Sequence, residues 1–207
     1  MRSHKNTIKC TPKCTPIFGA AIHVEKINCF YSTTFVTSVT FSDKEHHELR
    51  LATWDQFNIS ESLWTIPKKN TKTDVIHKIH LSQQVRALLD ELRQISSSQY
   101  VVAGAFDNEP LTENALARAA RRANKYIDIP HWTIHDLRRT FSTHLDETLH
   151  INPIVIEKCL AHRMHKIMAV YNKSEMLPER RDALNQWGRY IENVVINSNV
   201  IALEQVA

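Results

Sequence analysis

Residues 133–140 read Thr-Ile-His-Asp-Leu-Arg-Arg-Thr, a stretch that predicts both a helix and a chemical site. Thr133 precedes Asp136 by three residues, which is the spacing of a capping box at a helix N-terminus. Within that helix His135 and Arg138 are also three residues apart, so they share one face. An imidazole and a guanidinium near the positive end of a helix dipole suit an anion, particularly a phosphate. The alternative for these two residues alone is a surface histidine beside an ordinary ion-pairing arginine.

Capping residues and apolar spacing predict further helices on both sides of this stretch. Ser82 is an expected N-cap ahead of a stripe of leucine and valine, and Thr112 is expected to cap a second helix. Asn152 followed by Pro153 begins another helix, because proline suits the first helical position. The last helix is expected to start near Pro178.

The segment before these helices predicts a small sheet. Residues 48–54 are compatible with a short helix end, and residues 62–67 and 75–81 have the composition of two short strands. The lysine-rich stretch 68–74 joins them, so the two strands are expected to form a hairpin with a basic tip. The chain is therefore expected to be an α+β protein, mainly α-helical, with a small antiparallel β-sheet.

The composition excludes several functional classes. The 207 residues contain only three glycines, too far apart to form the phosphate-binding loop of a Rossmann or P-loop protein. The four cysteines form neither a disulfide framework nor a well-spaced zinc site, so we expect no metal. The apolar run near the N-terminus is too short for a signal peptide or a membrane span, so we expect a cytoplasmic protein with no membrane partner.

The charge distribution permits a nucleic-acid partner. The formal net charge is +4, and residues 118–125 carry four cations and no acid. A solvated helix face is the alternative explanation of this run.

Two further features join the first stretch in a recognisable order. Residues 159–162 read Cys-Leu-Ala-His, Tyr171 follows His162 by nine residues, and Lys72 lies in the hairpin tip. Together they resemble the tyrosine recombinase (phage integrase) family, in particular the branch found in satellite phages and prophages. The resemblance covers about residues 48–193.

The resemblance implies cleavage and rejoining of DNA with Tyr171 as the nucleophile, which becomes linked to a 3′-phosphate. A tyrosine phenol, with a pKa near ~10, needs fixed cations and donors to stabilise the developing negative charge. By resemblance Arg138, His135 and His162 supply these groups, and Lys72 protonates the departing 5′-oxygen. The bond energy is kept in the phosphotyrosine, so no cofactor and no metal are implied. A solvated hairpin tip is the alternative explanation of Lys72 alone.

The implied partner is double-stranded DNA at attachment sites, bound by a homo-oligomer as in intact members of the family. Phosphate contacts are expected from basic residues, which supply affinity without sequence choice. These residues are Arg118, Arg121, Arg122, Lys125 and Arg139. The catalytic domain is expected to span residues 44–196, preceded by an unassigned segment 1–43 and followed by a tail, 197–207.

One position departs from the family pattern. The family places an active-site arginine in a Thr-Gly-x-Arg-x-x-Glu turn, and Glu48 stands at its glutamate because Trp54 follows six residues later. Glu45 then occupies the arginine position, although Lys44 is a partial substitute if the turn is remodelled. The family's N-terminal DNA-binding domains are not recognisable before residue 44, so a truncated integrase with impaired recombination is expected.

Two other functions remain compatible with the sequence. The first is a non-catalytic DNA-binding or partner-binding remnant that modulates an intact integrase. The second is a helical transcription regulator built on the basic helix 112–125, which predicts sequence-specific binding indifferent to Tyr171 and Lys72.

Overall fold

The computed structural model describes residues 47–71, 74–104, 106, 108–125, 130–162 and 174–204, with side chains for all of these except residues 123 and 197–204. In chain order the elements are α3 (His47–Arg50), η1 (Trp54–Gln56), β1 (Phe57–Asn58), β2 (Leu63–Ile66), η2 (Lys68–Asn70), β3 (His77–His80), α4 (Gln83–Ile95), α5 (Ala115–Ala123), α6 (Ile134–Glu147), α7 (Pro153–Cys159) and α9 (Leu177–Glu204). Helices with one small sheet confirm the predicted α+β class.

The sheet is antiparallel with strand order β1-β2-β3, which confirms the predicted hairpin of β2 and β3. Trp64 and Ile66 alternate with half-buried residues along β2 and are fully buried on its inner face. Strand β1 was not predicted, because two residues are too few to show the two-residue period of a strand. Phe57 of β1 is positioned by stacking on Trp64, with ring centroids 5.1 Å apart.

The helix starts follow their capping residues in most cases. The Val85 N–H donates to Ser82 Oγ, and the Ile154 N–H donates to Asn152 Oδ1 at 2.9 Å, which confirms both predicted caps. The prediction for α5 was wrong, because this helix begins at Ala115 rather than directly after Thr112. The Thr112 hydroxyl instead accepts a hydrogen bond from the Arg118 guanidinium at 2.6 Å.

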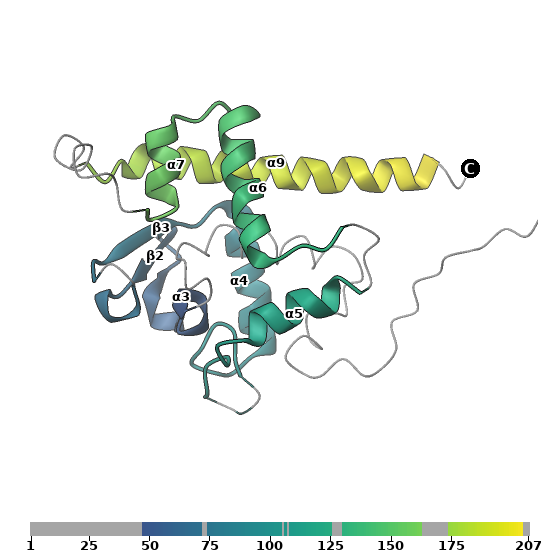
Figure 1. Ribbon diagram of the computed structural model, residues 1–207. Helices are drawn as coiled ribbons and strands as arrows, with labels where there is room; N and C mark the ends of the chain where they lie inside the picture. The colour runs from purple at the N-terminus through teal and green to yellow at the C-terminus, as the bar shows by residue number, and fades with distance from the viewer. Residues whose placement is uncertain are drawn as a thin grey trace, which may run out of the picture.

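The long helix α9 organises the core. It packs against β3, α4, α6 and α7, and its C-terminal part runs past α6 (Figure 1). Trp187 of α9 lies edge-to-face on Phe141 of α6, with ring centroids 5.3 Å apart, and both side chains are fully buried. The helix continues to Glu204, beyond residue 196, where the sequence analysis placed the end of the domain. No helix in the described ranges is both long and apolar enough to span a membrane.

A buried arginine fastens the hairpin to α9. Arg180 donates to the Lys78 carbonyl at 2.6 Å and to His77 Nε2 at 3.3 Å, and it pairs with the Glu175 carboxylate at 3.5 Å. Burial, helped by the neighbouring Arg180 charge, lowers the pKa of His77 to about 3, so the ring is neutral and accepts this bond. Arg180 therefore joins strand β3 to the beginning of α9.

Removing the aromatic centre of this core should be strongly destabilising. We expect Trp187→Ala to lower the free energy of unfolding by about 3–5 kcal/mol, because the side chain is 1% exposed and its removal leaves a cavity. Urea unfolding followed by circular dichroism measures the change. Ile196→Ala on the same helix is the control, since Ile196 is 53% exposed and should change stability by less than about 0.5 kcal/mol. Equal effects of the two substitutions would contradict this description of the core.

Candidate functional site

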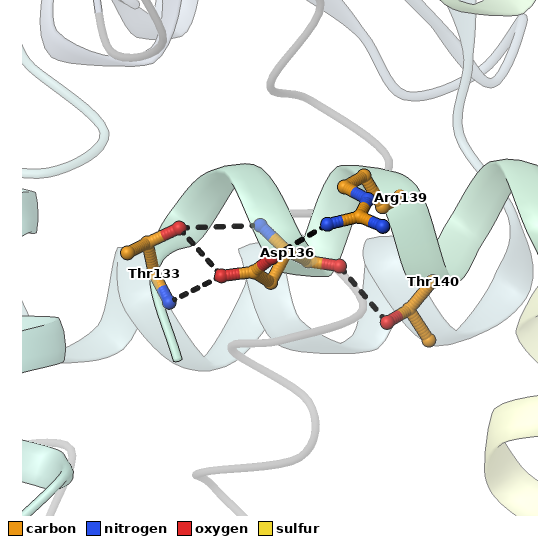
Figure 2. Close-up of polar contacts among 4 residues, drawn as sticks. All are labelled: Thr133, Asp136, Arg139 and Thr140. Atoms are coloured by element: carbon orange, nitrogen blue, oxygen red, sulfur yellow. Dashed lines mark hydrogen bonds and ion pairs between the residues drawn. The ribbon is translucent and has the colours of Figure 1, made fainter. Parts of the chain in front are cut away.

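The first turn of α6 is fixed by the capping box that the sequence predicted (Figure 2). The Asp136 N–H donates to Thr133 Oγ1, and the Asp136 carboxylate accepts from the Thr133 N–H at 2.9 Å and from its hydroxyl at 2.7 Å. These hydrogen bonds, with the side-chain bond from Thr133 the largest cause, lower the pKa of Asp136. The Thr140 hydroxyl donates to the Asp136 carbonyl at 2.9 Å in the next turn. This local network fixes the start of α6.

Arg138 points from α6 into the protein and is only 6% exposed. Its Nη2 donates to the Leu160 carbonyl at 2.8 Å and lies 2.5 Å from His162 Nε2. Leu160 is the C-cap residue of α7, where carbonyl groups without intrahelical partners favour a cation. Two residues that the sequence analysis assigned to one site, 24 positions apart, therefore lie in direct contact.

The end of α7 turns sharply to bring His162 to Arg138. Ala161 has a φ of 49°, in the left-handed region that costs a residue with a side chain roughly 1–2 kcal/mol. The turn returns the His162 N–H to the Glu157 carbonyl at 3.1 Å. The Glu157 carboxylate also lies 2.8 Å from His162 Nδ1. Sequence reasoning missed Glu157, because only this turn brings it to the ring.

Glu48 of α3 adds a buried acid to the site. Burial raises the pKa of its carboxyl from 4.5 to about 7, while the Arg138 charge acts to lower it. Its Oε2 has no hydrogen-bond partner within the part of the chain that the structure describes. The sequence analysis used Glu48 only to locate position 45; the structure places its charge close enough to act on Arg138.

Two other predicted site residues are exposed on α6. His135 is exposed in the first turn of α6, and Arg139 is 75% exposed while pairing with Asp136 at 3.5 Å. Lys72, Tyr171 and Glu45 lie outside the described residues. The structure therefore brings together Arg138 and His162 of the predicted set.

The basic helix lies beside the start of α6. The side-chain amide of Asn124, at the end of α5, donates to the Trp132 carbonyl at 2.7 Å and accepts from the Trp132 N–H at 2.9 Å. The predicted phosphate-contacting residues of this region all have exposed side chains: Arg118, Arg121, Arg122 and Lys125. The exposed cations of α5 and Lys125 are thus held beside the segment that leads into α6.

No group of three or more histidine, cysteine, aspartate or glutamate side chains arranged for a metal ion occurs in the described ranges. The site consists of cations, imidazoles, the buried acid Glu48 and the Glu157 carboxylate beside His162.

Comparison with known proteins decides the family. Residues 46–177 match the phage integrase family, which is more than half of the chain. This chain belongs to the phage integrase family. Prophage integrase IntZ of Escherichia coli strain K12 is 34% identical to it over 149 residues, which are 72% of this chain and 36% of IntZ. The integrase of Enterobacteria phage P4 is 29% identical over an alignment of 160 residues, which covers 70% of this chain and 36% of that protein. This integrase-family chain therefore spans about a third of the length of these relatives.

A solved structure has the same fold as this integrase-family chain. A lambda integrase dimer bound to a COC′ core site superposes with a TM-score of 0.50 at 19% identity, covering 77% of this chain and 56% of that one. The likeness confirms the predicted tyrosine-recombinase catalytic-domain fold.

The raised pKa of Glu48 makes the stability of the protein depend on pH. The folded state holds the proton with a pKa of about 7 and the unfolded chain with one near 4.5, so this contribution is complete below the lower value and is lost as the pH rises through the upper one. The difference corresponds to about 3 kcal/mol. A glutamine does not titrate, so Glu48→Gln lacks this pH-dependent loss. We therefore expect the free energy of unfolding of Glu48→Gln, relative to that of the unmodified chain, to increase by about this much from acidic to alkaline pH. Urea unfolding of both proteins on either side of the window measures it.

The control for this measurement is Glu147→Gln, because Glu147 is an exposed glutamate on α6. Its stability difference from the unmodified chain should stay constant with pH. A constant difference for Glu48→Gln as well would contradict the buried, protonated state of Glu48.

Proposed function

We propose that this chain is the catalytic part of a tyrosine recombinase, which cuts and rejoins double-stranded DNA through a 3′-phosphotyrosyl intermediate on Tyr171. The observation that carries the proposal is the buried Arg138 guanidinium, held by the Leu160 carbonyl and His162 in a chain of the phage integrase family. The covalent step replaces the 5′-oxygen at phosphorus by the Tyr171 oxygen. Lys72 supplies the proton that the 5′-oxygen takes as it leaves, and the phenol proton of Tyr171 passes to water.

The geometry of Arg138 supports this chemistry. Negative charge develops on the phosphate oxygens as the tyrosine oxygen attacks, and a fixed guanidinium stabilises that charge without reorganising. Arg138 is already fixed, because both its carbonyl and its imidazole contacts come from the end of α7. His135 at the positive end of α6 is a further donor that faces solvent.

The exposed cations support DNA as the partner. Exposed cations lie on α5 and directly after it: Arg118, Arg121, Arg122 and Lys125. The ion pair of Arg139 with Asp136 is exposed enough to be exchanged for a phosphate. We infer that the chain acts as a homo-oligomer on attachment-site DNA, in the cytoplasm. The related lambda integrase is a dimer bound to a core site.

Glu45 is proposed to impair the reaction. It precedes Glu48, which lies at the site, by three residues, and an anion there repels the charge that develops on the phosphate. Loss of one such donor costs about 2.7–4 kcal/mol, or roughly 100- to 1000-fold in rate. This position also favours the second candidate, a DNA-binding remnant that modulates an intact integrase.

Covalent trapping distinguishes the two candidates. On a nicked duplex that prevents rejoining, we expect the unmodified chain to form a slowly accumulating protein–DNA adduct, seen as a band of reduced mobility in a denaturing gel. Tyr171→Phe should abolish it, and Glu45→Arg should raise its rate roughly 100- to 1000-fold. Glu45→Ala is the control that removes the repulsion without adding a donor. If neither the unmodified chain nor Glu45→Arg formed an adduct, the result would favour the second candidate, a DNA-binding remnant that modulates an intact integrase.

The basic helix makes a separate prediction about binding. Each of Arg118→Ala, Arg121→Ala and Arg122→Ala should reduce the slope of log affinity against log salt by about 0.9, because each cation neutralises one phosphate. Fluorescence anisotropy with a labelled duplex measures the slope. Arg189→Ala removes an equally exposed charge from α9 and should leave it unchanged. Equal slopes for the α5 variants and the unmodified chain would exclude this helix from the DNA interface.

A further inference from the structure

One tautomer of His162 satisfies all its neighbours. A guanidinium is always protonated and only donates, so Arg138 Nη2 beside His162 Nε2 requires a lone pair on Nε2. A neutral imidazole with its lone pair on Nε2 carries its proton on Nδ1. That nitrogen faces the Glu157 carboxylate at 2.8 Å, which accepts the bond. The opposite tautomer would set one N–H against another and a lone pair against a carboxylate.

Glu157 holds His162 at two points. Its backbone carbonyl accepts the His162 N–H at 3.1 Å, and its carboxylate faces Nδ1 of the ring. Both contacts depend on the left-handed turn at Ala161, which folds the chain back over the end of α7. One residue thus fixes the position of the His162 backbone and the direction of its ring.

We propose that Glu157 is a positioning residue of this site, which selects the Nδ1–H tautomer of His162 and directs Nε2 at Arg138. The inference rests on the proposed function in that Arg138, which His162 holds, is the group that meets the DNA phosphate. The row Glu157–His162–Arg138 keeps the guanidinium in place before DNA arrives, so that less reorganisation accompanies the reaction. Partners one step removed from the reacting groups act in this way in metal sites, where their loss costs 10- to 100-fold.

Nitrogen-15 NMR of the full chain without DNA tests the tautomer directly. At a pH where the histidines are neutral, we expect His162 to show a protonated Nδ1 and an unprotonated Nε2, with the signals assigned through His162→Gln. Glu157→Gln should keep this pattern, because its amide oxygen still accepts from Nδ1–H. Glu157→Ala should convert it to a mixture of tautomers. Glu147→Ala removes an exposed carboxylate from α6 and should change nothing.

Cleavage of the nicked duplex provides the second measurement. Glu157→Ala should lower the single-turnover rate of adduct formation about tenfold or more, with unchanged half-saturation by DNA, and Glu157→Gln should restore most of it. An Nε2–H tautomer in the unmodified chain, or an unchanged tautomer in Glu157→Ala, would overturn the proposal. The NMR experiment contains no DNA and so does not depend on cleavage. If every protein failed to cleave, that result would count against the proposed function, and the tautomer measurement would still decide the role of Glu157.

Discussion

A buried guanidinium must have its charge and its N–H groups satisfied, and this requirement on Arg138 links the parts of the structure. Leaving such a cation unpartnered costs several kcal/mol. Its hydrogen-bond partners are the Leu160 carbonyl and the His162 ring, both at the end of α7, and the buried carboxyl of Glu48 on α3 lies within reach of its charge. The buried guanidinium therefore ties α6 to the end of α7. The aromatic packing of α9 on α6 and the Arg180 link from α9 to β3 hold the surrounding frame.

The scarcity of glycine shapes the turns around this centre. In the described part of the chain, the positive φ angles belong to residues with side chains: Ser62, Asp74, Asn108, His150, Ala161 and Met176. Each left-handed residue with a side chain costs roughly 1–2 kcal/mol, which surrounding contacts must offset. At Ala161 the offsetting contacts are those of His162 with Glu157 and Arg138, so the strain is located where the site is built.

Features that depend on nearest neighbours were predictable from the sequence. The capping box of Thr133 and Asp136 and the caps at Ser82 and Asn152 follow from residues three or fewer positions apart, and the structure confirms them. Strand β1 was not predictable, because its two residues are too few to show the two-residue period of a strand. The start of α5 was not predictable either, because it follows a turn and has no side-chain cap. The meeting of Arg138 with His162 was expected only through the family resemblance. The contact of Glu157 with His162 depends on the left-handed turn at Ala161, and an alanine gives no sequence signal of such a turn.

The central claim is that the cations and imidazoles around Arg138 serve a covalent bond between Tyr171 and DNA. The most direct measurement is peptide mass spectrometry of the protein after incubation with a nicked duplex and complete nuclease digestion. The account predicts a nucleotide attached through its 3′-phosphate to Tyr171, absent when Arg138 is replaced by alanine. A nucleotide on another residue, or the same modification of Tyr171 in the Arg138→Ala protein, would contradict it.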